Sequence, residues 1–273
     1  MTGMKRSIEL NDDLYSEYEE LLLRRDQMYV EADSYLVAYT REFGDLIIKN
    51  FELKIECIRR KKTISACMRR MNRGLGIDVQ EMQKDIEKEM TAYYVQLKEM
   101  TDNSSAAKNA EIIDGYCVRH SKKIYRRIAK RLHPDVNKKT LENEVLKDLW
   151  MRTVKAYRNS EAEELEKMEV LIRRALKELG DEGFEINFDD IEERIARLEA
   201  EIHEIAATEP YTYGAILGDK EKIRELKEAL EEEHADYERY LAQLDAELEK
   251  LIGREIRFAD FYRSCGRIRF YPA

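Results

Sequence analysis

The residues best suited to directional contacts lie in the sequence KKIYRRIAKRLHPDVN, which begins at Lys122. Its first ten residues contain six cationic side chains: Lys122, Lys123, Arg126, Arg127, Lys130 and Arg131. A tripeptide with different chemistry follows: His133, Pro134 and Asp135. An exposed aspartate can accept a charge-assisted hydrogen bond from a partner arginine, histidine offers a directional donor or acceptor, and proline stiffens the turn. These groups are suited to binding another protein, and none needs to act on a substrate.

The spacing of the same residues predicts the helix that presents them. A helical projection gathers six residues on one face: Ser121, Ile124, Tyr125, Ile128, Ala129 and Leu132. The cations fill the opposite face. Pro134 disfavours the α region for the residue before it, so the helix should end by His133 and leave the tripeptide in an exposed turn. Thr140 is a plausible cap for a second helix, Leu141 to Tyr157, and the two helices should form an antiparallel pair.

The sequence of this pair resembles the J-domain family of DnaJ-like co-chaperones over about a quarter of the 273 residues. YRRIAKRLHPDVN is similar to the second helix and signature loop of that family, and LWMRTVKAYRN is similar to its third helix. The resemblance implies that the protein stimulates ATP hydrolysis by a DnaK-type chaperone. The tripeptide and the six cations would then be the partner-binding residues, and the cations would steer the domain towards an acidic patch on the ATPase.

The chain departs from that family in two respects. The candidate for the family's first helix, Asp85 to Met100, lies about twenty residues before Lys122 instead of a short loop away. The glycine- and phenylalanine-rich linker and the cysteine-rich zinc module of full DnaJ proteins are absent. We therefore expect a divergent member with an N-terminal helical region (1–84), a J-domain-like region (85–160), a helical hairpin (161–252) and a tail (253–273).

The rest of the chain predicts an all-α fold. Charged residues make up 38% of the sequence, and only 3 prolines and 11 glycines interrupt it, a composition typical of long helices. Apolar residues recur at helical spacing from Asn11 to Arg73 and from Val79 to Met100, and the polar stretch TDNSSAAKN after Met100 is predicted to be a loop.

Three heptad seams follow in the C-terminal half, from Leu165 to Leu179, from Ile191 to Ile205 and from Ile223 to Leu251. If the chain folds back near Pro210, the second and third seams pair as an antiparallel coiled-coil hairpin, and the first seam covers the leucines that would otherwise be unpaired. The rival is a homodimer that pairs these leucines between chains. His234 falls on the third seam, where a tolerated polar layer is expected.

Other features exclude several classes of function. No apolar run is long enough to span a membrane and the N-terminus lacks a signal peptide, so we expect a cytoplasmic protein. The net charge of −9 argues against nucleic-acid binding. Cys117 and His120 form a CxxH pair, but no second pair completes a metal site. No phosphate-cradling loop or nucleophile motif is present, so we expect neither an enzyme nor a cofactor.

Two functions therefore remain open. One is a co-chaperone that couples a DnaK-type ATPase to a client protein chosen by the flanking helices. The other is a helical scaffold or adaptor, in which the J-like region is a docking module and the acidic hairpin carries the function. An intact His-Pro-Asp sequence in an exposed loop favours the co-chaperone.

Overall fold

The computed structural model describes residues 2–73, 79–110, 115–179 and 191–252. These residues form helices and turns without a strand, so the predicted all-α class is confirmed. The chain divides into two compact units, one made of residues up to Leu36 together with Ala110–Ala215 and the other of Val37–Asn109 together with residues from Ile216 onward. These boundaries differ from the predicted ones because segments distant in sequence pack together. Helix α1 (Thr2–Asn72) contributes to both units.

The core of the first unit is built by α3 (Gly115–Leu132), α5 (Glu144–Arg158) and α6 (Ala162–Glu178). The six residues predicted on the apolar face of α3 are all buried, which confirms the helical projection. Helix α6 adds Leu165, Met168, Ile172 and Leu176 to the same core. The first part of α1 joins it through Leu23 and the partly buried Val30.

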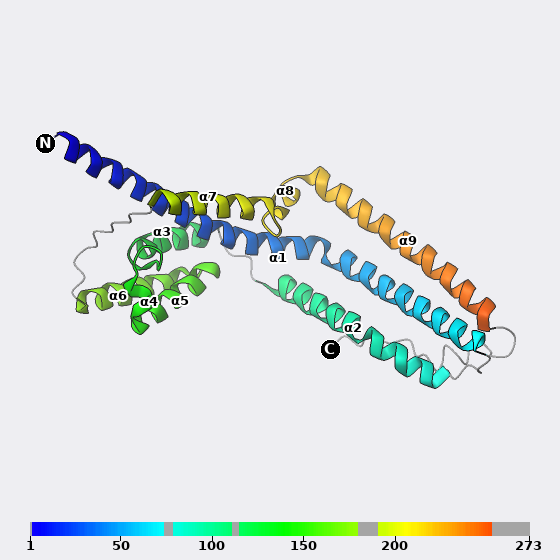
Figure 1. Cartoon of the computed structure of the whole chain (residues 1–273). Helices are drawn as coiled ribbons and strands as arrows, with labels where there is room; N and C mark the ends of the chain where they lie inside the picture. The colour runs from blue at the N-terminus through cyan, green and yellow to red at the C-terminus, as the bar shows by residue number, and fades with distance from the viewer. Residues whose placement is uncertain (1, 74–78, 111–114, 180–190, 253–273) are drawn as a thin grey trace. The chain divides into compact units, whose positions relative to one another are not determined.

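A second cluster in the first unit joins α1 to α7 (Ile191–Ala207), which lies beside it in Figure 1. Tyr18 and Leu22 of α1 pack there with three residues of the α7 seam: Ile191, Ile195 and Leu198. Val136, the residue after the His-Pro-Asp sequence, is 4% exposed and belongs to the same cluster. The loop is therefore packed against the cluster that joins α1 and α7.

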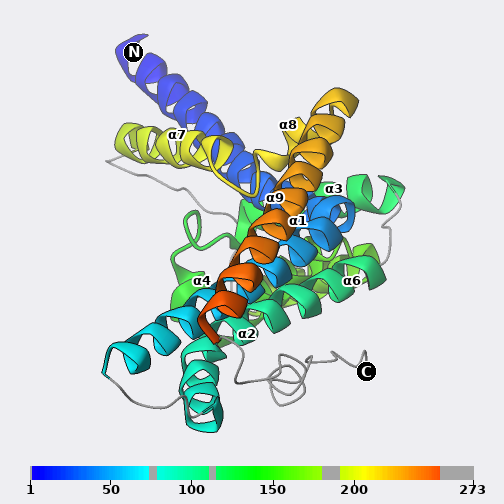
Figure 2. The same ribbon diagram turned by 90° about the vertical axis from the view of Figure 1, so that its right-hand side faces the viewer.

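The second unit packs the later part of α1 between α2 (Val79–Asn109) and α9 (Lys220–Ile252) (Figures 1 and 2). Helix α2 continues through residues 101–109, so the loop predicted there was wrong. Ser104 and Ala107 are buried on α1, and the Arg41 Nε donates a hydrogen bond to the Ala107 carbonyl at 2.5 Å. A Cβ atom on Gly44 would lie 3.2 Å from the Ser104 Oγ, so the glycine permits this close approach.

The connection between α3 and α5 differs from the prediction in its cap. A short helix, α4 (Lys139–Glu142), precedes α5. Thr140 lies inside α4, and the residue that caps α5 is Asn143, whose side chain accepts hydrogen bonds from the amides of Val145 and Leu146. Asn143 can do so because its backbone is extended, with φ −110° and ψ 116°.

The predicted C-terminal hairpin is not the packing that the described residues adopt. The α6 seam packs on α3 and α5, and the α7 seam packs on the first part of α1. The α9 seam packs on the later part of α1 and on α2, where Leu244 and Leu248 are buried. Each seam therefore packs against helices other than the seam with which the sequence spacing had paired it. The predicted break at Gly180 to Asn187 and the tail at 253–273 lie outside the described residues.

His234 of α9, predicted to lie in a polar layer, contacts a buried amide of α1. The His234 Nδ1 donates a hydrogen bond to the Asn50 Oδ1 at 2.9 Å. Asn50 is 4% exposed, and its Nδ2 donates to the Leu230 carbonyl at 2.8 Å. A buried amide that satisfies both its donor and its acceptor in this way fixes the register of α9 on α1.

None of the described helices is both long enough and apolar enough to cross a membrane.

Candidate functional site: the His-Pro-Asp turn and its cover

The two helices that carry the predicted site run antiparallel. Tyr125 of α3 stacks on Tyr157 near the end of α5, with ring centroids 4.0 Å apart and planes 8° from parallel. His133, one residue beyond α3, makes an edge contact with Trp150 in the middle of α5, with centroids 4.8 Å apart. Contacts therefore move towards the start of α5 as α3 approaches its end. The predicted antiparallel pair is present.

The turn between the helices is held by its own hydrogen bonds. The amides of Val136 and Asn137 donate to the His133 carbonyl at 2.9 and 2.7 Å. Asn137 is 1% exposed, and its side chain closes both ends of the turn. Its Nδ2 donates to the Arg131 carbonyl at 2.9 Å, and its Oδ1 accepts from the Lys139 amide at 3.0 Å. The turn is therefore rigid, as the proline within it also favours.

The prediction that this tripeptide lies in an exposed turn is wrong for His133. The residue is only 5% exposed, whereas Pro134 and Asp135 are half-buried. The Asp135 amide donates to the His133 Nδ1 at 3.1 Å, so Nδ1 must accept and the neutral ring carries its proton on Nε2. That Nε2 lies 3.5 Å from the Oδ2 of Asp26 on α1 and 3.4 Å from the Arg25 Nη2.

Asp26 is the residue around which this arrangement is organised. The Tyr125 hydroxyl donates to its Oδ2 at 2.6 Å, and the Arg25 Nη2 donates to its Oδ1 at 2.9 Å. Burial alone would raise the pKa of the Asp26 carboxyl. The contacts with His133, Tyr125 and Arg25 outweigh burial and hold that pKa below its ordinary value. Asp26 is therefore a buried, ionised carboxylate.

Asp135 has a partner within the same unit. The Arg25 Nη1 lies 3.5 Å from the Asp135 Oδ2 and 3.5 Å from the Oε2 of Glu201 on α7. The Asp135 side chain is 44% exposed, whereas that of Arg25 is 16% exposed. Glu201 also accepts a hydrogen bond from the Tyr29 hydroxyl at 3.0 Å. One arginine thus connects the loop to α7.

The six predicted cations fall into two groups. Arg127 pairs with Glu169 of α6 through two hydrogen bonds of 2.8 and 2.7 Å, and Lys130 pairs with Glu19 of α1 at 2.8 Å. The hydrogen bond from Arg127 also lowers the pKa of Glu169. The other four form no ion pair with another described residue, and all but the half-buried Lys122 are exposed: Lys122, Lys123, Arg126 and Arg131.

Sequence reasoning missed the residues that cover the loop: Glu19, Arg25, Asp26 and Glu201. The candidate for the family's first helix, Asp85–Met100, belongs to α2 and the second unit. The sequence did contain a signal that Asp26 is buried and paired. Asp26 lies on the stripe formed by Tyr18, Leu22 and Val30 at steps of four, and a carboxylate on an apolar stripe requires partners.

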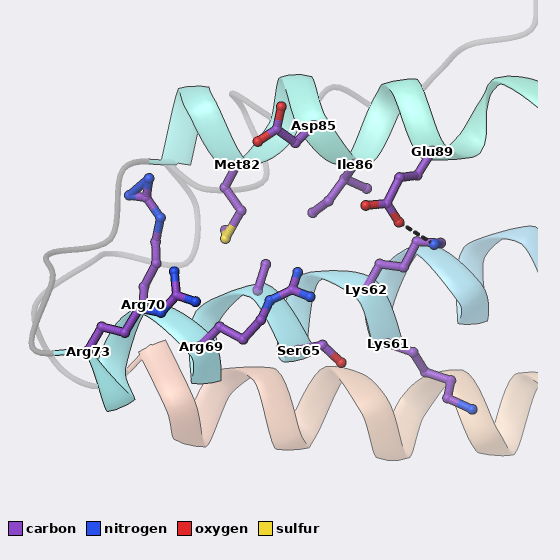
Figure 3. Close-up of a pocket in the computed structure, with 11 residues that line it drawn as sticks. Lys61, Lys62, Ser65, Arg69, Arg70, Arg73, Met82, Asp85, Ile86 and Glu89 are labelled. Atoms are coloured by element: carbon purple, nitrogen blue, oxygen red, sulfur yellow. Dashed lines mark hydrogen bonds and ion pairs between the residues drawn. The ribbon is translucent and has the colours of Figure 1, made fainter.

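A second group of charges lies in the other unit, around a hollow of about 470 Å³ between the end of α1 and the start of α2 (Figure 3). Five cations line it: Lys61, Lys62, Arg69, Arg70 and Arg73. Figure 3 shows Lys62 reaching Glu89 across the hollow, and Arg70 pairs with Glu81. Cations are also favoured at the C-terminal end of a helix such as α1. Two of these cations, Lys62 and Arg70, therefore help to hold α2 against α1.

His120 of the CxxH pair contacts residues of α3 and α6. The His120 Nε2 lies 2.9 Å from the Oε1 of Glu166, and its ring stacks on Tyr116 with centroids 5.7 Å apart. Over residues 2–73, 79–110, 115–179 and 191–252, no three His, Cys, Asp or Glu side chains are arranged to hold a metal ion.

Comparison of the chain with models of protein families, with curated proteins and with solved structures gives no match in any of the three. The resemblance to J-domains therefore depends on the residues of α3, the turn and α5.

Proposed function

We propose that this protein is a co-chaperone that stimulates the ATPase of a DnaK-type chaperone through the His-Pro-Asp turn and the basic face of α3. The observation that carries the proposal is the antiparallel pair of α3 and α5, joined by a rigid turn that begins with His133, Pro134 and Asp135. A basic face suits the recognition of an acidic surface, because complementary charge raises the association rate and fixes orientation.

Two details of the pair support this function. The apolar face of α3 is wholly committed to the core, so the opposite face is available with Lys123, Arg126 and Arg131 exposed. The turn is fixed by Asn137, so a partner would not need to order it on binding. The flanking helices would select the client protein, and a cytoplasmic location agrees with such a role.

A scaffold or adaptor is the second candidate, and one observation favours it. His133 and Asp135 already have partners within the first unit, so the tripeptide has a structural role of its own. An intact His-Pro-Asp sequence therefore has a use in this fold besides partner binding. In the scaffold the turn would simply fasten α1 to the α3 and α5 pair.

Steady-state ATP turnover by a purified DnaK-type chaperone, with and without the full chain, tests the proposal. We expect substoichiometric protein to raise turnover, and Asp135→Asn to abolish the increase. Asp148→Asn is the matched control, because it makes the same change at an exposed carboxylate on α5. Circular dichroism should show equal helical content in all three proteins.

Charge reversal separates the contribution of the basic face. Arg126→Glu with Arg131→Glu should slow association with the chaperone and reduce its dependence on salt, because these two arginines form no ion pair with a described residue. Two results would reject the co-chaperone in favour of the scaffold. One is that the wild-type protein does not change ATP turnover by the chaperone, and the other is that Asp135→Asn stimulates turnover as much as the wild-type protein does.

A further inference from the structure

We propose that α1 and its neighbouring helices hold the His-Pro-Asp turn in a closed state by supplying the contacts that a chaperone would otherwise make. This inference rests on the proposed function and concerns the regulation of the same site. Its basis is that the turn and two of the six basic residues have a counterpart of opposite charge inside the first unit.

The first counterpart is Arg25. The partner contact expected of Asp135 is a charge-assisted hydrogen bond with an arginine. Arg25 already forms an ion pair with Asp135, with its Nη1 3.5 Å from the Asp135 Oδ2. Glu201 and Asp26 hold the same guanidinium from two other sides. An incoming arginine would have to displace a side chain that three carboxylates anchor.

The second counterpart is acidic and faces the basic helix. The proposed partner surface is an acidic patch, and Glu19 and Glu169 already contact Lys130 and Arg127. Glu19 lies on α1 and has a side chain only 13% exposed, so the salt bridge it forms is partly shielded from water. These acids reduce the charge that a partner would meet at the end of α3 next to the turn.

The closure is completed by apolar packing and by the buried carboxylate. Val136 is buried in the cluster that also contains Leu22 of α1 and Ile195 of α7. His133 is covered on the side of α1 by Asp26. Both residues adjoin Pro134 and Asp135, so α1 must separate from the turn before a partner can surround the tripeptide.

The closed state can be opened by removing the ion pair between Arg25 and Asp135, whose carboxylate side chain is 44% exposed. A partly exposed ion pair shifts a two-state equilibrium by up to about fivefold. Replacing Arg25 by glutamine should therefore lower the concentration of protein that gives half-maximal stimulation of the chaperone by about two- to fivefold. Arg24→Gln is the matched control, because Arg24 is the exposed neighbour on the same helix.

A second substitution opens the contact with the basic helix without altering the buried network. Glu19→Gln removes the partner of Lys130, and Glu20→Gln is its control at the exposed neighbouring position. Glu19→Gln should also lower the concentration for half-maximal stimulation. It keeps the inference testable if Arg25→Gln fails to fold.

Closure itself has a readout that needs no chaperone. Diethyl pyrocarbonate modifies accessible histidines, and peptide mass spectrometry reports each one separately. In the wild-type chain His133, which is 5% exposed, should react much more slowly than the exposed His203. Arg25→Gln should accelerate the reaction of His133 and leave that of His203 unchanged, whereas Arg24→Gln should change neither.

The outcomes separate this inference from the proposed function. His133 that reacts as fast as His203 in the wild type, or stimulation that neither Arg25→Gln nor Glu19→Gln increases, overturns the closed state as a regulator. Turnover that no protein in the series stimulates, although His133 becomes reactive in Arg25→Gln, rejects the co-chaperone itself and with it the regulation of that activity.

Discussion

Two stacked tyrosines allow the buried network at Asp26 to be tested with nearly identical substitutions. Tyr125 and Tyr157 are both buried and stack with ring centroids 4.0 Å apart. The Tyr125 hydroxyl donates to the Asp26 Oδ2 at 2.6 Å, whereas the Tyr157 hydroxyl forms no hydrogen bond with a described residue. Burial raises the pKa of both hydroxyls, that of Tyr157 to about 12, so both remain protonated at neutral pH.

Replacing each tyrosine with phenylalanine keeps the ring and removes only the hydroxyl. A hydrogen bond to a charged group contributes about 1.5–3 kcal/mol, so Tyr125→Phe should lower the free energy of unfolding of the first unit by that amount. Tyr157→Phe should change it by less than about 0.5 kcal/mol, because no hydrogen bond is lost. In an Asp26→Asn background the cost of Tyr125→Phe should fall, since a neutral amide is the weaker acceptor.

Urea unfolding followed by tryptophan fluorescence measures this difference. Trp150 is the only tryptophan in the chain, and its ring centroid lies 5.8 Å from that of Tyr125, so its emission reports on the first unit. Equal losses for Tyr125→Phe and Tyr157→Phe, or an unchanged cost in the Asp26→Asn background, would refute the reasoning that Asp26 is a buried carboxylate held by Tyr125.

Three further outcomes follow from the structure. Because the pKa of Asp26 is lower in the folded chain than its unfolded value near 4, its ionised form stabilises the first unit above about pH 5. That contribution is lost as the pH falls through the folded pKa, so the gap in unfolding free energy between wild type and Asp26→Asn should shrink during acid titration; a constant gap would contradict the lowered pKa. Asn143→Ala should cost about 0.5–2 kcal/mol in urea unfolding because α5 loses its cap, and no loss would indicate that Thr140 supplies it. Leu248→Ala should cost the second unit about 2–5 kcal/mol by hydrogen exchange, since Leu248 is 0% exposed among residues of α1 and α2, and a loss typical of a surface leucine would contradict that packing.

Some features of the site could be predicted from the sequence, and others could not. The apolar face of α3, the end of that helix near His133 and the pairing of α3 with α5 follow from helical periodicity and from the backbone restriction before proline, both of which act within a few residues. The loop predicted at residues 101–109 was wrong because a contact between distant segments overrides the local preference. Its polar composition favours a loop, but packing of Ser104 and Ala107 on α1 stabilises helix there.

The heptad seams show the same limit. Their spacing correctly identified most of the apolar faces of α6, α7 and α9, including the buried Leu244 and Leu248. Leu179, the predicted end of the first seam, is 48% exposed instead. Spacing does not determine which other seam a face will meet, because many helices offer apolar stripes of similar pitch. The hairpin of the second and third seams was therefore one of several compatible pairings, and α1, with 71 residues, provided faces for both.

The sequence by itself determined the helical class, the amphipathic faces and the location of the rigid turn, since each depends on local backbone preference and periodicity. Only the tertiary structure decided that His133 is covered, that Asp135 pairs with Arg25 and that Glu19 meets Lys130. Those contacts join residues about 110 positions apart. Their formation depends on how α1 and α7 pack around the turn, and no local pattern near the turn encodes that arrangement.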